Sequence, residues 1–124
     1  MALKPNPVNW FEIPAKDISR ATKFYQNIFG VELQLNEMAN TKMAWFPMAQ
    51  NSAGAGGTLI KGDGYKPSTS GTLVYFSVDD IESTLKKITA EGGKTLEPKS
   101  SIGEHGFIAL FEDSEGNRIG LHSK

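Results

Sequence analysis

The sequence has 124 residues, a net charge of −1, 39% hydrophobic residues and 22% charged residues, which are ordinary proportions for one globular domain. A charge this close to zero gives no reason to expect nucleic acid or an anionic membrane as a partner. The absence of cysteine excludes disulfides, thiolate nucleophiles and zinc–thiolate sites. No apolar run is as long as a membrane span and no signal-peptide pattern is present, so we expect a cytoplasmic protein.

The first half of the chain predicts a β-α-β-β-β unit. A strand is expected at residues 8–13, and Asp17 is a suitable N-cap for the amphipathic helix that follows. Gly30 suits the left-handed position just past the end of that helix. Further strands are expected at residues 31–35, 41–48 and 58–61, with a flexible segment at 50–57.

The second half repeats this pattern. Asp80 holds the position that Asp17 holds in the first half, and it again precedes an amphipathic helix, which ends at Gly92 and Gly93. The DSEGN run at residues 113–117 predicts a tight turn, with Gly116 at the position that needs a positive φ. The strands of this half are expected at residues 72–78, 94–97, 107–112 and 118–122.

A strand–helix unit used twice at half-chain spacing indicates an internal duplication within one domain. The predicted fold is therefore α+β, with two β-α-β-β-β modules at about residues 7–62 and 72–122, joined by a Gly/Pro/Ser-rich linker at 62–71. Each module would form a curved mixed sheet with a helix on its convex face, and the concave faces would border a central cleft. Edge strands at both ends of such sheets also favour pairing of two copies into a homodimer.

The segments FEIPAKDISRATKFYQNIFG and VYFSVDDIESTLKKITAEGG, together with GFIALFEDSEGNRIGL, resemble the glyoxalase/bleomycin-resistance/extradiol-dioxygenase superfamily, also called the vicinal oxygen chelate superfamily. The resemblance covers about residues 7–122. It implies paired β-α-β-β-β modules and, commonly, a homodimer. It also implies that enzymes of the family bind a divalent metal through His, Gln or Glu at one position on the first and last strands of each module.

Those four positions fall here on Trp10 and Gly57 in the first module and on Leu73 and Gly120 in the second. The two members of each equivalent pair are separated by the same interval as Asp17 and Asp80. Indole, alkyl and backbone groups do not bind a hard or borderline divalent cation. We therefore predict no cofactor; a divalent metal would have to be bound by other residues, of which Glu12, His105 and His122 are the conceivable set.

Seven residues are candidates for contact with a small molecule in the cleft: Trp10, Glu12, Leu73, Tyr75, His105, Arg118 and His122. Trp10 and Tyr75 offer flat walls for stacking, whereas Trp45 is interpreted as a core residue. Glu12 is the candidate catalytic acid or base, or else a carboxylate paired with Arg118 or a lysine. His105 and His122 are candidate ligand or base groups, or else solvated surface residues.

The sequence leaves three functions open. One is a metal-free binding protein for a small, partly aromatic or apolar molecule, similar to the antibiotic-sequestering members of the superfamily. Another is a lyase, isomerase or dioxygenase-type enzyme that uses divergent or metal-free acid–base chemistry. The last is a module whose role is assembly. We favour the binding protein, because the aromatic residues are present and the metal ligands are not.

Overall fold

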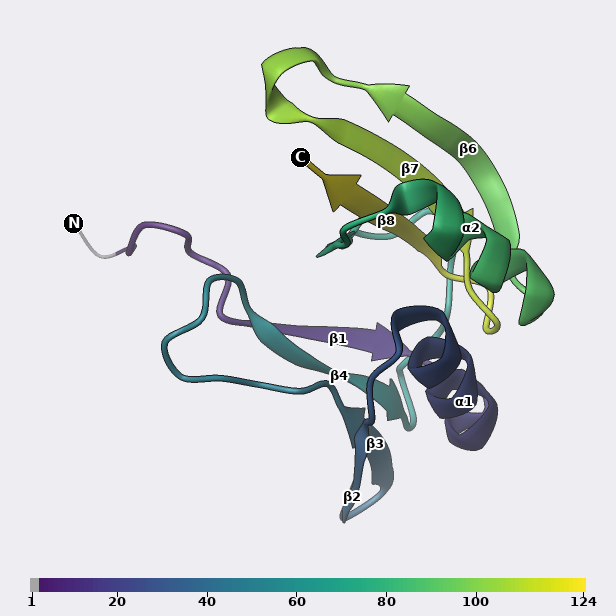
Figure 1. The fold of residues 1–124 in the computed structure, drawn as a ribbon. Coiled ribbons are helices and arrows are strands. Elements are labelled where there is room, and N and C mark those ends of the chain that lie inside the picture. Colours follow the sequence, from purple (N-terminus) through teal and green to yellow (C-terminus); the bar gives the residue numbers. More distant parts are fainter. Residues whose placement is uncertain (1–2) are drawn as a thin grey trace.

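The structure is a computed structural model that describes residues 3–124. It contains eight strands, two α-helices and one short 3-10 helix (Figure 1). The elements are β1 (Trp10–Pro14), α1 (Ile18–Phe29), β2 (Gln34–Met38), β3 (Thr41–Trp45), β4 (Gly56–Lys61), β5 (Tyr75–Ser77), α2 (Ile81–Ala90), β6 (Lys94–Ser101), η1 (Gly103–His105), β7 (Phe107–Glu112) and β8 (Arg118–Ser123).

The strands form two four-stranded sheets of identical topology. The strand orders are β1-β4-β3-β2 and β5-β8-β7-β6, and each sheet combines one parallel pair with two antiparallel pairs. These are the two mixed-sheet β-α-β-β-β modules and the α+β class that the duplication predicts. Neither helix is long and apolar enough to cross a bilayer within residues 3–124.

The helices begin and end where the sequence predicts. The Asp17 side chain accepts a hydrogen bond from the N–H of Arg20 at 3.0 Å, and Gly30 ends α1 with φ of +64°. The Asp80 side chain caps α2 in the same way by accepting from the N–H of Ser83 at 3.1 Å.

Several strands are displaced from their expected bounds. The side chain of Gln26 accepts from the N–H of Leu33, which holds the chain after α1 against the helix end and delays β2 to Gln34. Pro47 cannot donate to a ladder, and β3 stops before it at Trp45. β6 continues past its expected end to Ser101, with two register shifts against β7 that accommodate Pro98.

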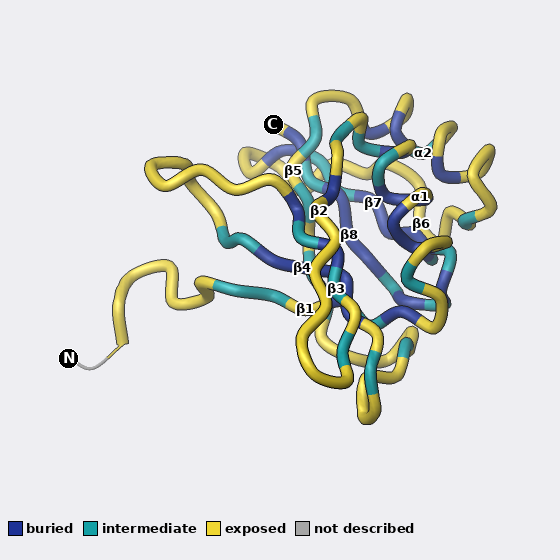
Figure 2. Tube along the Cα trace, turned by 90° about the horizontal axis from the view of Figure 1, so that it is seen from below, coloured by how far each residue is buried: buried dark blue, intermediate teal, exposed yellow. Residues whose placement is uncertain are grey.

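One hydrophobic core joins the two modules. Each helix covers one face of its own sheet, and the two helices contact each other (Figure 1). Phe24 and Tyr25 of α1 reach across to rings of the second module, Phe111 and Phe76, at centroid distances of 6.3 and 6.0 Å. Figure 2 shows the outcome: β4, β7, β8 and the inner sides of the helices are buried, whereas the edge strands β2 and β6 are exposed.

The turn at residues 113–117 locks the second module onto the first. The Tyr25 hydroxyl donates to Oδ2 of Asp113 at 2.7 Å, and Nδ2 of Asn117 donates to the carbonyl of Pro14 at 2.8 Å. Burial and the adjacent Asp113 carboxylate raise the pKa of Tyr25 well above its usual value, which keeps the phenol protonated as the donor.

Glu115 makes the densest contacts of this turn. Its Oε1 accepts from the backbone N–H groups of Lys16 and Asp17, both at 2.8 Å, and its Oε2 accepts from Nε of Arg20 at 2.7 Å. A carboxylate at the start of α1 also interacts favourably with the helix dipole. Glu115 is only 4% exposed, so this carboxylate is a central tie between the modules.

We predict that Glu115→Gln lowers the free energy of unfolding by about 1–3 kcal/mol at neutral pH, because charge-assisted hydrogen bonds are lost at a buried position. Burial raises the pKa of the Glu115 carboxyl, but hydrogen bonds from Arg20, Asp17, Ser114 and Lys16 outweigh it and leave that pKa below its usual range. The contribution of Glu115 is therefore complete above about pH 4.3, the ordinary value for Glu, and is lost as the pH falls further.

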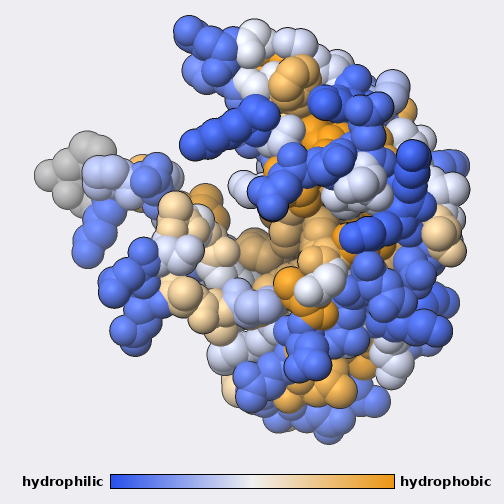
Figure 3. Space-filling view, viewed as in Figure 1, coloured by the Kyte–Doolittle hydropathy of each residue, from blue (hydrophilic) through white to orange (hydrophobic). Residues whose placement is uncertain are grey.

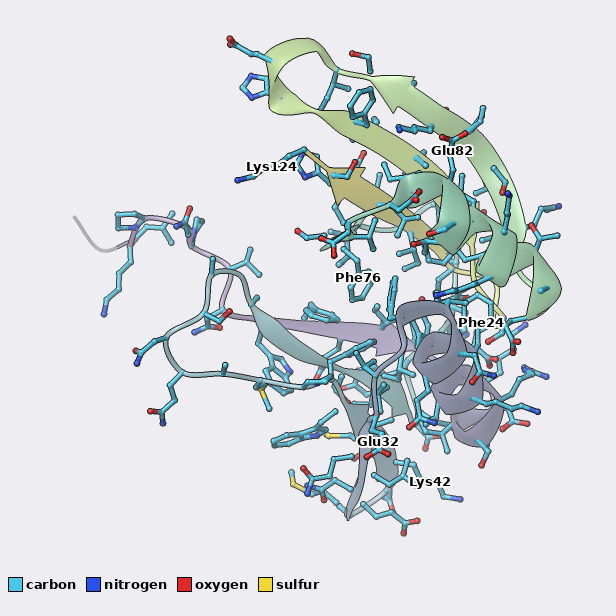
Figure 4. The ribbon with its side chains drawn as sticks, viewed as in Figure 1. Phe24, Glu32, Lys42, Phe76, Glu82 and Lys124 are labelled. Carbon is cyan, nitrogen blue, oxygen red and sulfur yellow. The ribbon has the colours of Figure 1, made fainter. Side chains whose placement is uncertain are left out.

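Urea unfolding at several pH values checks this prediction. Glu32→Gln is the matched control, because Glu32 is exposed (Figure 4). Equal destabilisation by the two substitutions, or an unchanged acid limb in Glu115→Gln, would contradict the role of the turn.

Candidate functional site

Each sheet has a second face that carries no helix. Side chains alternate along a strand, so Phe11 and Ile13 enter the core while Trp10 and Glu12 lie on the opposite face. In the second module Phe76 and Leu121 enter the core. The helix-free face of the first module, here called the first face, carries Trp10, Glu12, Met43, Trp45 and Thr58. The helix-free face of the second module, here called the second face, carries Tyr75, Leu110, Arg118, Gly120 and His122. Because both helix-covered faces share one core, the first and second faces of a single chain point away from each other.

The first face holds a pair of tryptophans. The rings of Trp10 and Trp45 meet edge-to-face at a centroid distance of 5.4 Å and an interplanar angle of 74°. Nε1 of Trp45 donates to Sδ of Met43 at 3.3 Å, and Met48 lies over Gly56, where a Cβ would come within 2.6 Å of its sulfur. Trp45 is half-buried on this face, so its interpretation as a core residue is wrong. The result is an apolar, polarisable surface suited to a flat ligand.

The second face is built around Gly120. The ring of Tyr75, its partner on β5, occupies the space that a Cβ would need there, and Tyr75 remains 45% exposed. Leu110 is the partner of Gly120 on β7. Arg118 and His122 flank Gly120 on the same face. Nε2 of His122 lies 2.7 Å from the carbonyl of His105, and since a carbonyl only accepts, Nε2 carries the proton and donates it.

The register corrects one expected position. Phe11 pairs with Gly57, and a Cβ at Gly57 would meet the Phe11 ring, so Gly57 lies on the helix-covered face. Thr58 pairs with Glu12 and takes the place on the first face that Gly120 takes on the second. The interval between equivalent positions is therefore one position shorter from β4 to β8 than from β1 to β5. A single interval for both pairs of strands therefore predicts Gly57 on β4, one residue before the true equivalent, Thr58.

The residues at these positions do not fit a divalent metal. The four side chains would be those of Trp10, Thr58, Leu73 and Gly120, and only Thr58 carries an oxygen. Its hydroxyl lies 3.0 and 2.7 Å from the carbonyls of Ala44 and Leu59, within donating distance of both. In the part of the chain that the structure describes, no three His, Asp or Glu side chains gather closely enough to hold a metal ion.

A crevice of about 1040 Å³ runs between β1 and β5 and opens on the side of the N-terminal segment (Figure 3). Trp10, Glu12, Leu73 and Tyr75 are among the residues that line it, whereas His105, Arg118 and His122 are not. The structure thus brings four of the seven candidates together along the crevice. Arg118 and His122 lie on the second face, and His105 lies in the short η1 segment.

The base of the crevice is aromatic and was not foreseen. Phe11, Phe29 and Phe46 surround Phe76 at centroid distances of 5.6, 4.8 and 5.3 Å, and Phe76 projects between the modules (Figure 4). Alternation along the strands places Phe11, Phe46 and Phe76 on a core face and helical spacing places Phe29 there, but no sequence pattern indicates that this core remains open along one side. The two thioethers beside the tryptophans, Met43 and Met48, were likewise missed, since Met48 follows the end of β3.

The fold and faces define a small duplicated α+β protein whose helix-free sheet surfaces are available to ligands or to another chain. The chain belongs to the glyoxalase/bleomycin resistance protein/dioxygenase superfamily, whose family model matches residues 8–121. A glyoxylase-like domain-containing protein of Didymella fabae is 33% identical over 114 residues, which are 89% of this chain and 88% of that protein.

Two solved structures illustrate the fold. TnmS3, an antibiotic binding protein from Streptomyces sp. CB03234, is 25% identical with a TM-score of 0.70, over 99% of this chain and 98% of TnmS3. A glyoxylase/bleomycin resistance protein/dioxygenase domain from Frankia sp. EAN1pec has a TM-score of 0.72 at 16% identity, over 94% of this chain and 95% of that one.

Proposed function

We propose that this protein binds a small, partly aromatic or apolar molecule on its helix-free faces and does so without a metal. The observation that carries the proposal is the Trp10–Trp45 pair on the first face, in which Trp10 stands at a position where the enzymes of the superfamily would have a metal ligand. Two indoles with Met43 and Met48 beside them form a stacking surface for a flat molecule. The likeness to TnmS3, an antibiotic binding protein, supports a binding role over a catalytic one.

A homodimer is part of the proposal, because one chain cannot enclose the ligand. Its first and second faces point in different directions, and a second copy related by a twofold axis could place its second face opposite the first. β1 and β5 each lie at an end of their sheets and present an unpaired edge. The phenylalanine-lined crevice between these edges offers apolar surface that a second copy would bury.

Catalysis through Glu12 is the alternative. The Glu12 carboxylate is exposed on the first face and forms no hydrogen bond or ion pair within residues 3–124, so it is available as an acid or base. If turnover of any bound compound is found, Glu12→Gln should abolish it and leave binding of that compound intact. Unchanged turnover in Glu12→Gln would remove Glu12 from the chemistry.

We predict that a bound aromatic ligand quenches the fluorescence of Trp10 and Trp45, since both rings form the binding surface. N-phenylnaphthylamine, a neutral aromatic probe, should bind at least about tenfold more weakly to Trp10→Ala, as expected when a stacking wall is removed. Trp45→Ala should retain part of the quenching. A Trp10→Ala variant that binds the probe as wild type does would refute the placement of the site.

We also predict that Val8→Glu weakens self-association at least about tenfold, because it places a charge on the rim of the apolar crevice. Val8 is 65% exposed, so folding should be unaffected. Leu3→Glu is the matched control: Leu3 is 59% exposed but does not line the crevice. Light scattering across a dilution series measures the effect. Identical association of both variants, or a monomeric wild type, would contradict the dimer.

A further inference from the structure

Arg118 carries a buried donor without an acceptor. Its Nε is shielded from solvent and makes no hydrogen bond, the one buried side-chain nitrogen or oxygen in this condition within residues 3–124. Neither Nη nitrogen has a hydrogen-bond partner in the same residues, and neither is buried. The guanidinium therefore presents an accessible edge whose inner donor is unpaired. An unsatisfied buried donor costs stability, so its presence calls for an explanation.

The nearby carboxylates do not supply the missing acceptor. Glu112 is the direct partner of Arg118 across the β7–β8 ladder, yet no ion pair forms between them within 4.0 Å. Glu12, which the sequence offers as a partner, lies on the other module's face and forms no ion pair with Arg118 either. The backbone N–H of Arg118 is already used, since it donates to the carbonyl of Ser68 at 3.3 Å.

The surroundings of Arg118 indicate what the acceptor would be attached to. Gly120 follows Arg118 by two residues on β8. The exposed ring of Tyr75 lies over Gly120, and Leu110 is the partner of Gly120 on β7. Nε2 of His122 is already used, because it donates to the carbonyl of His105. The second face thus combines one planar cation with an exposed aromatic ring on neighbouring strands.

We propose that Arg118 receives the acidic group of the ligand, which is therefore an aromatic molecule bearing a carboxylate, sulfonate or phosphate. The planar guanidinium donates two parallel hydrogen bonds to such a group from its accessible Nη nitrogens, while the aromatic body packs against the exposed ring of Tyr75. This inference rests on the proposed binding function and specifies its ligand class. It assigns Arg118 a binding role and no catalytic one.

A pair of fluorescent probes tests the proposal. Anilinonaphthalene sulfonate and N-phenylnaphthylamine share the same aromatic skeleton, and only the first carries an anion. Both are titrated into wild type and into Arg118→Met, which keeps the side-chain bulk but removes every donor. Lys86→Met is the matched control, since Lys86 lies exposed on α2 and its loss changes the net charge equally. Arg118→Gln is a second variant that retains polarity.

We expect wild type to bind the sulfonate about tenfold more tightly than the neutral probe, the factor expected of a charge-assisted hydrogen bond. Arg118→Met and Arg118→Gln should abolish that preference and leave the affinity for the neutral probe unchanged, whereas Lys86→Met should preserve it. The melting temperature of Arg118→Met should equal or exceed that of wild type, because an unsatisfied buried donor is removed. The sulfonate should raise the melting temperature of wild type and not of Arg118→Met.

Two results would overturn the proposal. One is an unchanged sulfonate preference in both Arg118 variants. The other is weaker self-association in both Arg118→Met and Glu12→Gln, which would mean that Glu12 of a second copy is the acceptor. Failure of the broader binding function looks different: the neutral probe would then bind Trp10→Ala and Tyr75→Ala as tightly as wild type, whatever happens at Arg118.

Discussion

The arrangement of the two modules depends on one turn. Asp113, Glu115 and Asn117 reach from the second module to the start of α1 and the end of β1, and each of these buried side chains loses a hydrogen-bond partner if that contact is broken. Buried carboxylates without partners are costly, so the turn stabilises one relative placement of the modules. That placement directs both helices into a common core and turns both helix-free faces outward.

The outward faces connect the fold with its proposed function. The sheet faces without a helix leave several side chains accessible: two tryptophans and two methionines on one module, and Tyr75 and Arg118 on the other. Neither set of side chains encloses a ligand on its own, because each forms a single open surface. The proposed dimer brings two different walls together, one aromatic and one bearing a cation, around a ligand that fits both.

The sequence predicted the fold well because its signals are local. The caps at Asp17 and Asp80, the helix end at Gly30 and the DSEGN turn each determine backbone geometry within a few residues, and the duplication supplied the topology.

The site was predicted less completely, because it depends on register. The interval from Asp17 to Asp80 also relates β1 to β5, but the interval from β4 to β8 is one position shorter, so Gly57 was placed where Thr58 lies. Alternation alone could not show that Trp45 is only half-buried or that the core stays open beside the phenylalanines of the crevice. The hydrogen bond of His122 to His105 joins segments with no sequence signal.

The central claim is that two copies of this chain, without a metal, form the binding site for a small aromatic molecule. A native mass spectrum of the freshly purified protein tests it most directly, since it reports subunit number, bound metal and any retained organic molecule together. The account predicts a dimer without a divalent ion, part of which carries a small organic mass. A monomer, or a dimer holding one divalent ion per chain, would contradict it.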